Sequence, residues 1–223
     1  MTVITISRQH GSGGDEIADR LCEKLGYPTF DKSLITRAAK EAGFSEQEIY
    51  DYSEDSHKVR SFLDRLFSRS AVLSAGRMWE DGGGMYLPEE LTLSEDVMIT
   101  LVQKAIQSAY ETGNMVIIGR GSQVLLKDKP GVVHIRIEAP IEDRVQRVRE
   151  LLKQERQTFQ ADLEIRRDAQ DQILERDAAS ADYIKRFYNV DWSDALLYHA
   201  VLNTGRMTLE RATQIIVDLV NNP

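Results

Sequence analysis

The stretch ITISRQHGSGGDEIADRL, residues 4–21, contains a buried strand, a glycine-rich loop and the beginning of a helix. Its β-branched apolar start is typical of a buried strand. The loop, residues 11–14, is followed by a helical pattern that opens at Asp15 and places Ile17 on its apolar face. In α/β proteins, such a succession presents backbone N–H groups to phosphate. The stretch therefore predicts either a phosphate-binding loop or a glycine turn that merely connects the strand and the helix.

The loop departs from the Walker phosphate-binding pattern, G-x-x-x-x-G-K-[ST], at three positions. If Gly13 takes the second glycine position, Arg8 stands at the first. Gly14 then replaces the lysine, and Asp15 replaces the hydroxyl residue that binds Mg²⁺. The loop geometry can survive these changes, but the positive charge on the β- and γ-phosphates must come from another residue.

The composition excludes several classes of protein. A formal net charge of −8 and a pI near 5.1 argue against a general nucleic-acid binder, which is usually basic. The single cysteine, Cys22, rules out an intramolecular disulfide. The chain shows no apolar signal segment, and no apolar run approaches the ~20 residues needed to span a bilayer. We therefore expect a cytoplasmic protein without membrane or nucleic-acid partners.

The apolar segments indicate parallel strands that alternate with helices, and hence a sheet covered on both faces. They lie at residues 3–6, 115–118, 132–137 and 200–202, with a brief extended piece at 27–30. Two segments interrupt this alternation, residues 31–93 and 142–195. We interpret the first as a helical insertion and the second as a projecting arm. Because residues 142–175 are strongly charged and sparsely apolar, we expect the arm to have a largely solvated face.

This order of elements resembles that of nucleoside monophosphate kinases, and more narrowly the cytidylate kinase-like branch of the P-loop kinases. The resemblance runs nearly from end to end and rests on five places. They are the loop at residues 11–14, FDKSLITRAAKEAG at 30–43, IIGRGSQVLL at 117–126, the segments at 175–177 and 183–188, and VLNTGRMTLE at 201–210.

The resemblance implies a three-layer α/β P-loop kinase fold with a five-stranded parallel sheet, formed by a single domain over residues 1–223. Residues 31–93 would form the helical acceptor-binding insertion, and residues 142–195 the helical lid. It also implies phosphoryl transfer from ATP, with Mg²⁺, to a nucleotide-like or other small acceptor. The arm and the arginine-rich segment at residues 57–79 each offer a surface for a homodimer.

The resemblance further implies which residues hold ATP. Its phosphates would lie against His10, Gly11, Ser12, Gly13, Gly14, Asp15 and Glu16, and its adenine beside Asn203 and Thr204. Asp15 has two open interpretations, as a ligand of Mg²⁺ or as the N-cap of the helix. His10 either contacts phosphate or is an incidental loop residue.

On the acceptor side, Arg37 and Arg120 would clamp a phosphate in bidentate fashion. The alternative is that each arginine pairs with surface acids, but Arg120 stands between two glycines at a strand's end, which favours binding. Asp31 would either orient the acceptor or cap the next helix.

The charge of the absent lysine would come from cationic side chains of the loop and of the closing lid. These catalytic candidates are Arg8, Arg176, Lys185 and Arg186.

Three substitutions separate the chain from true cytidylate kinases and leave the acceptor open. Gly121 replaces the aspartate that follows the acceptor arginine, and Ala179 and Ala181 stand where those enzymes carry lid arginines. Two alternatives to a small-molecule kinase are considered. One is a nucleotide-binding regulatory protein that has lost turnover together with the lysine, and the other is a polynucleotide kinase, which the acidic pI disfavours.

Overall fold

The computed structural model describes three segments of the chain, residues 1–30, 95–156 and 162–222. The insertion predicted at residues 31–93, with Asp31 and Arg37, lies outside these segments. The chain divides into two compact units, Met1–Phe30 with Tyr110–Pro223, and Asp31–Ala109. Helix α5, Glu95–Thr112, is the described part of the second unit and ends in the first.

The first unit is built on a parallel sheet whose strands lie in the order β2-β1-β3-β4. Its strands are β1 (Val3–Arg8), β2 (Met115–Ile118), β3 (Val132–Glu138) and β4 (Ala200–Asn203). All four lie where the apolar segments predicted them. The fifth strand is reduced, within the described residues, to a single parallel bridge between Thr29 and Val116 at the β2 edge.

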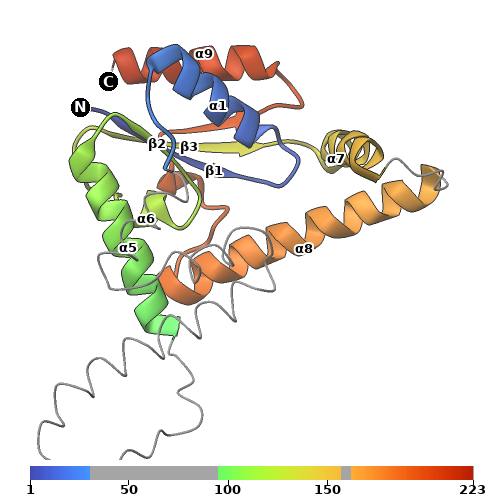
Figure 1. Ribbon diagram of the computed structural model, residues 1–223, viewed down its shortest axis with the longest axis horizontal. Helices are drawn as coiled ribbons and strands as arrows, with labels where there is room; N and C mark the ends of the chain where they lie inside the picture. Colours follow the sequence, from blue (N-terminus) through green and yellow to red (C-terminus); the bar gives the residue numbers. More distant parts are fainter. Residues whose placement is uncertain (31–94, 157–161, 223) are drawn as a thin grey trace, which may run out of the picture. The chain divides into compact units, whose positions relative to one another are not determined.

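Helices cover both faces of this sheet (Figure 1). Helices α1 (Gly14–Leu25) and α9 (Leu209–Asn221) lie together on one face, and the short helix α6 (Ser122–Leu125) lies on the other. The central strand β1 is covered on both sides, because Ile4 and Ile6 on one face and Thr5 and Ser7 on the other are all buried. This burial fixes the carboxyl end of β1, and hence the start of the glycine loop.

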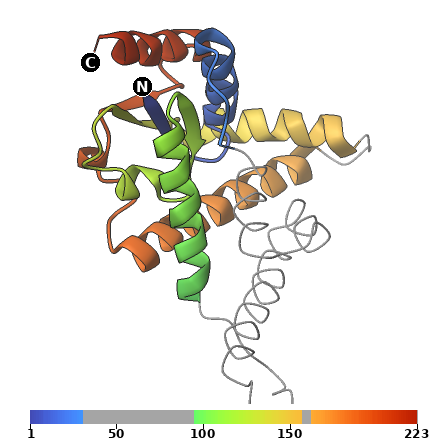
Figure 2. The ribbon, with the colours of Figure 1, turned by 60° about the vertical axis from the view of Figure 1, so that its left-hand side comes forward.

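The arm consists of two helices, α7 (Ile141–Arg156) and α8 (Asp162–Tyr188), which lie side by side in Figures 1 and 2. They share an apolar cluster that includes Val148, Ile165 and Ile173. The expectation of a largely solvated charged segment is therefore only partly right. None of the described helices is long and apolar enough to cross a membrane.

Candidate phosphate-binding site

The glycine loop joins β1 to α1 through a backbone that alternates in handedness. Gly11 and Gly13 have φ values of 76° and 80°, whereas Ser12 between them does not have a positive φ. Such alternation makes successive N–H groups converge on a concave anion site. Gly13 is the N-cap of α1, and no side chain caps the helix. The first N–H groups of α1 are therefore available to a ligand.

This geometry corrects one expectation for Asp15. It does not cap α1, because Gly13 holds the N-cap position and Asp15 lies in the first turn. Its carboxylate accepts a hydrogen bond from Arg8 Nε at 2.9 Å, and its side chain remains 66% exposed. An acidic group there is stabilised by the positive end of the helix dipole and is accessible to a cation.

Close packing leaves no room for side chains at the two left-handed glycines. A Cβ atom on Gly11 would come within 2.8 Å of Val148 Cγ2, and one on Gly13 within 2.6 Å of Leu209 Cδ2. The loop is thus packed between α7 on one side and the start of α9 on the other. Both positions require glycine for conformation and for space.

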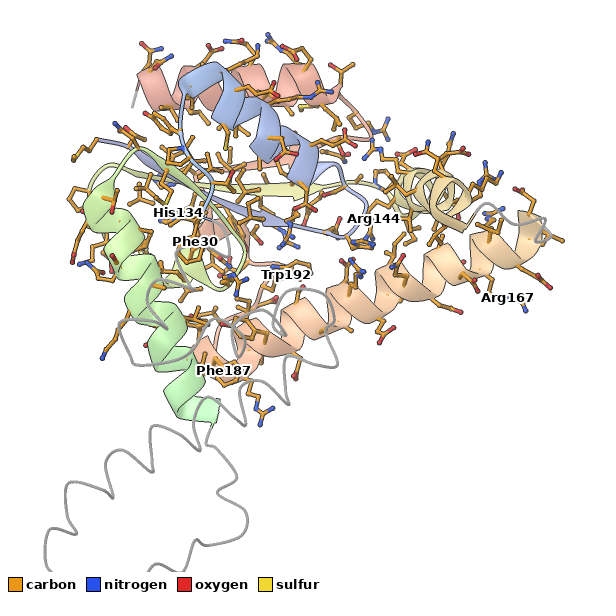
Figure 3. The ribbon with its side chains drawn as sticks, in the orientation of Figure 1. Phe30, His134, Arg144, Arg167, Phe187 and Trp192 are labelled. Carbon is orange, nitrogen blue, oxygen red and sulfur yellow. The ribbon has the colours of Figure 1, made fainter. Side chains whose placement is uncertain are left out.

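The arm contacts the loop through an ion pair at its base. Asp177 of α8 accepts the His10 backbone N–H at 2.8 Å with one oxygen and pairs with Arg144 of α7 through the other. Arg144, which Figure 3 shows at the start of α7, is only 6% exposed and also donates to Ala139 O and to His10 O. A charge this buried needs such partners. The interaction therefore holds α8 to the loop.

The His10 side chain lies in a strongly charged environment. Burial lowers the pKa of its imidazole, and the nearby Arg176 lowers it further, while Asp177 and Asp15 oppose this effect. These effects together favour the neutral imidazole, and the interaction places Arg176 near the loop. An anion bound to the loop would raise the pKa of His10.

A second polar network supports the loop from the β4 side. Thr204 Oγ1 donates to Ser12 O at 2.6 Å and accepts from Arg147 Nη1 at 3.0 Å. Arg147 of α7 also donates to Thr204 O and to Gly11 O. Two carbonyls of the loop are thus satisfied by protein donors, which leaves the first N–H groups of α1, rather than these C=O groups, for ligand binding.

Ser12 contributes no side chain to the open face of the loop. It is fully buried, and its Oγ has no hydrogen-bond partner among the described residues. Its N–H donates to Gln9 O at 3.2 Å. Glu16, by contrast, is exposed in the first turn of α1.

The turn after β2 carries Arg120 at the same edge of the sheet. Gly119, Arg120 and Gly121 form a run of left-handed residues, with φ values of 67°, 59° and 73°. Left-handed backbone is costly for a residue with a side chain, and such strain concentrates at functional sites. Arg120 O accepts a hydrogen bond from Tyr188 of α8, and a Cβ atom on Gly121 would overlap the Tyr188 ring. An aspartate at position 121 would meet the same ring.

The segment after α8 is anchored below the sheet by an aromatic and cationic cluster. Trp192 Nε1 donates to Ser7 Oγ at 2.8 Å, directly before Arg8. The Arg136 guanidinium lies 4.3 Å from the centroid of the Trp192 ring and donates to Trp192 O. Tyr183 packs edge-on against Phe187. These aromatic residues at the base of the arm therefore serve packing.

Of the remaining predicted site residues, Thr204 lies under the loop, where it donates to Ser12 O, and the three others are exposed. Lys185 and Arg186 are exposed, roughly 14 Å further along α8 than Arg176, given the 1.5 Å rise per residue. Arg186 lies over the Phe187 ring. Asn203 is exposed and accepts the Gly205 N–H, whereas the neighbouring Thr204 is buried under the loop.

Sequence reasoning missed Arg144, Arg147 and Asp177 as supports of the loop. A usable signal was present, because Arg144 and Arg147 stand three residues apart just after Pro140, which ends a buried strand. That spacing places both on one face of a helix that starts at the sheet edge carrying the loop. The high overall charge of the arm concealed it.

In the segments that the structure describes, no group of three or more His, Cys, Asp or Glu side chains is placed to hold a metal ion by itself. The exposed Asp15 carboxylate suits Mg²⁺, which proteins commonly hold through one or two carboxylates together with substrate phosphates.

The comparisons with known proteins agree with this architecture. The sequence model of the cytidylate kinase-like family matches residues 3–206. A cytidylate kinase from Methanocaldococcus jannaschii is 24% identical over 99% of this chain and 98% of its own length. The crystal structure of an uncharacterized protein from Eubacterium ventriosum is 17% identical, covers 100% of both chains and superimposes with a TM-score of 0.62, which shows the fold. The chain belongs to the cytidylate kinase-like family, and it is a nucleotide or small-molecule kinase.

Proposed function

We propose that the protein transfers the γ-phosphoryl group of ATP, with Mg²⁺, to a nucleotide-like or other small phosphorylated acceptor. The observation that carries this proposal is the uncapped N-terminus of α1 behind the alternating loop at residues 11–13. Free N–H groups and the positive helix end favour the β-phosphate of a nucleotide. The loop lies at the carboxyl end of β1, where parallel α/β sheets bind their ligands.

The acceptor phosphate is assigned to the neighbouring turn, with Arg120 as its cation. Its guanidinium is carried on a left-handed backbone that the Tyr188 hydroxyl contacts through Arg120 O. A backbone fixed in this way limits the positions that the side chain can reach, which suits bidentate recognition of phosphate. Arg37 would complete the clamp from outside the described residues.

Mg²⁺ would be held by Asp15 together with the ATP phosphates, and it would neutralise charge on the transferring group. The chain itself supplies the loop N–H groups and the cations Arg8 and Arg176 at the phosphates. As the acceptor oxygen bonds to the γ-phosphorus, the bond from that phosphorus to the β,γ-bridging oxygen breaks, and ADP leaves with the electron pair. A fully ionised phosphate acceptor carries no proton to lose, so the step needs positioning and charge neutralisation more than a base.

The test is ADP release from ATP and Mg²⁺ in the presence of nucleoside monophosphates, nucleosides and small phosphorylated metabolites. We expect stimulation by one acceptor, and a loss of that stimulation of at least about 100-fold in Arg120→Ala, because charged hydrogen bonds to the phosphate are removed. Arg211→Ala, on the exposed side of α9, is the matched control and should behave as wild type.

Two outcomes would contradict the proposal. Unchanged acceptor affinity in Arg120→Ala would remove the acceptor assignment. Tight ATP binding with no ADP release across the whole panel would instead indicate a nucleotide-binding regulatory protein.

A further inference from the structure

The two loop positions that depart most from the phosphate-binding template are in contact with each other. The template has glycine at the first position and lysine at the seventh, whereas this chain has Arg8 at the first and Gly14 at the seventh. A Cβ atom on Gly14 would lie 2.5 Å from Arg8 Cβ and 2.7 Å from Arg8 Cγ. The stem of Arg8 therefore occupies the space in which a side chain at position 14 would begin.

The far end of Arg8 is placed as specifically as its stem. Its Nη1 atom lies 3.1 Å from where a Cβ atom of Gly119 would be, at the carboxyl end of β2. Its Nε atom donates to Asp15 in the first turn of α1. The side chain thus runs from the end of β1 past the N-terminus of α1 toward the turn that carries Arg120. This is the space between the phosphate loop and the proposed acceptor site.

We propose that Arg8 has exchanged roles with position 14 and carries the phosphate-binding charge that the template assigns to the lysine. Gly14 and Gly119 are then the two glycines that make room for the arginine. This inference rests on the proposed function, since it concerns the phosphates of the same ATP.

The Arg8–Asp15 ion pair fits a resting state of this cation. The side chains are 34% and 66% exposed, and exposed ion pairs contribute little to stability. A polyphosphate, with several negative charges and pairs of oxygens that a guanidinium binds in bidentate fashion, competes well for Arg8. When Arg8 turns to phosphate, the Asp15 carboxylate is freed for Mg²⁺. One rearrangement would therefore prepare both the cation site and the metal site.

The test measures binding of ATP with Mg²⁺, and of inorganic tripolyphosphate, by titration calorimetry. Arg8→Met keeps the aliphatic stem over Gly14 and removes the charge, so we expect both dissociation constants to rise roughly 10- to 100-fold. Arg8→Lys should retain most of the affinity. The matched control is Arg20→Met, which removes a cation that pairs with Glu210 away from the loop and should bind as wild type.

A reciprocal exchange tests the transposition itself. Arg8→Gly and Gly14→Lys should each weaken binding, the first by loss of charge and the second by collision with the Arg8 stem. The double variant Arg8→Gly/Gly14→Lys restores the template order and should bind tripolyphosphate within about 10-fold of wild type, if one lysine contact replaces one arginine contact. Thermal melting and circular dichroism identify which variants are folded.

The outcomes separate this inference from the function on which it rests. If wild type binds neither ATP nor tripolyphosphate, both fail. If wild type binds and Arg8→Met binds equally well, only the role of Arg8 is overturned. A folded double variant that binds no better than Arg8→Gly would overturn the exchange of roles.

Discussion

Two glycine-rich turns follow neighbouring strands at the same edge of the sheet, and their backbones are built in different ways. After β1, Gly11 and Gly13 are left-handed and alternate with Ser12, which is not. After β2, the left-handed conformation continues through three consecutive residues, including Arg120. Alternation brings N–H groups together, whereas the continuous run presents one side chain from a strained position. The first turn is suited to binding through its backbone, and the second through its arginine.

The two turns also differ in what holds them. The loop after β1 is enclosed by apolar side chains, with Val148 and Leu209 against its glycines. The turn after β2 is held by Tyr188, at the end of α8. Movement of α8 can therefore reach the second turn directly, while the first turn is fixed to the body of the sheet as well as to the arm.

The largest expected effect comes from Gly13→Ala. Left-handed backbone costs an L-residue about 1–2 kcal/mol, and forcing Leu209 aside adds about 1–3 kcal/mol. We expect the free energy of unfolding, measured by urea denaturation, to fall by about 3 kcal/mol. ATP binding should weaken at least about 100-fold, because the convergent N–H groups no longer share one centre.

Gly26→Ala is the matched control for this substitution. Gly26 is also left-handed, with a φ of 69°, but nothing lies within 4 Å of the position of its Cβ atom. In Gly26→Ala the free energy of unfolding should fall only by the conformational cost, about 1–2 kcal/mol, and the affinity for ATP should stay at the wild-type level. Equal losses of stability at both positions would show that contact with Leu209 does not constrain the loop.

The difference between the turns also shows which features could be predicted from sequence patterns. Strand, glycines and helix at residues 4–21 predicted the first turn, because a local pattern of residue types encodes it. The packing of Leu209 on Gly13 could not be predicted, since it joins positions 196 residues apart. The interaction of Arg8 with Gly14 was missed for another reason. The template treats the positions of the loop one at a time, whereas these two substitutions compensate for each other in space.

The arm shows the same limit. Its helical character was predicted correctly, but charge patterning suggested a solvated surface for a segment in which Arg144 is buried. Burial of that guanidinium depends on Asp177, 33 residues later, and on the His10 carbonyl. The local density of charged residues cannot distinguish a solvated arginine from a buried one, because the partners of a buried arginine lie elsewhere in the chain.

A second prediction concerns the sheet that carries both turns. It uses the pH dependence of the stability of the protein. Burial, assisted by the neighbouring His199, lowers the pKa of His134 in β3 to about 4. The unfolded chain, with a histidine pKa of 6.5, therefore takes up a proton first as the pH falls. The contribution of His134 to stability is full above pH 6.5, is lost progressively between pH 6.5 and about 4, and changes no further below that. The loss from this shift is about 3 kcal/mol at 1.36 kcal/mol per pKa unit.

His134→Asn tests this assignment. The amide can keep a hydrogen bond to Thr5, whose Oγ1 lies 2.7 Å from His134 Nδ1, but it does not titrate. Urea denaturation at pH 7 and pH 4.5 should show a smaller difference in the variant than in wild type. An unchanged difference would assign the acid sensitivity to other groups.

Among the substitutions in the two turns, the smaller effect is expected after β2, in Gly121→Ala. The added methyl group overlaps the Tyr188 ring, but this side chain is half-buried near the end of α8 and can move aside. We therefore expect a loss of about 2 kcal/mol from backbone strain and displacement together. The double variant Gly121→Ala/Tyr188→Ala removes the ring and so relieves its overlap with the added methyl group. We expect this variant to be more stable than the sum of the two single losses predicts. Additive losses would show that Tyr188 is not energetically coupled to this turn. Non-additive losses, together with weaker binding of the acceptor in Tyr188→Ala, would show that α8 positions Arg120 through the Arg120 carbonyl.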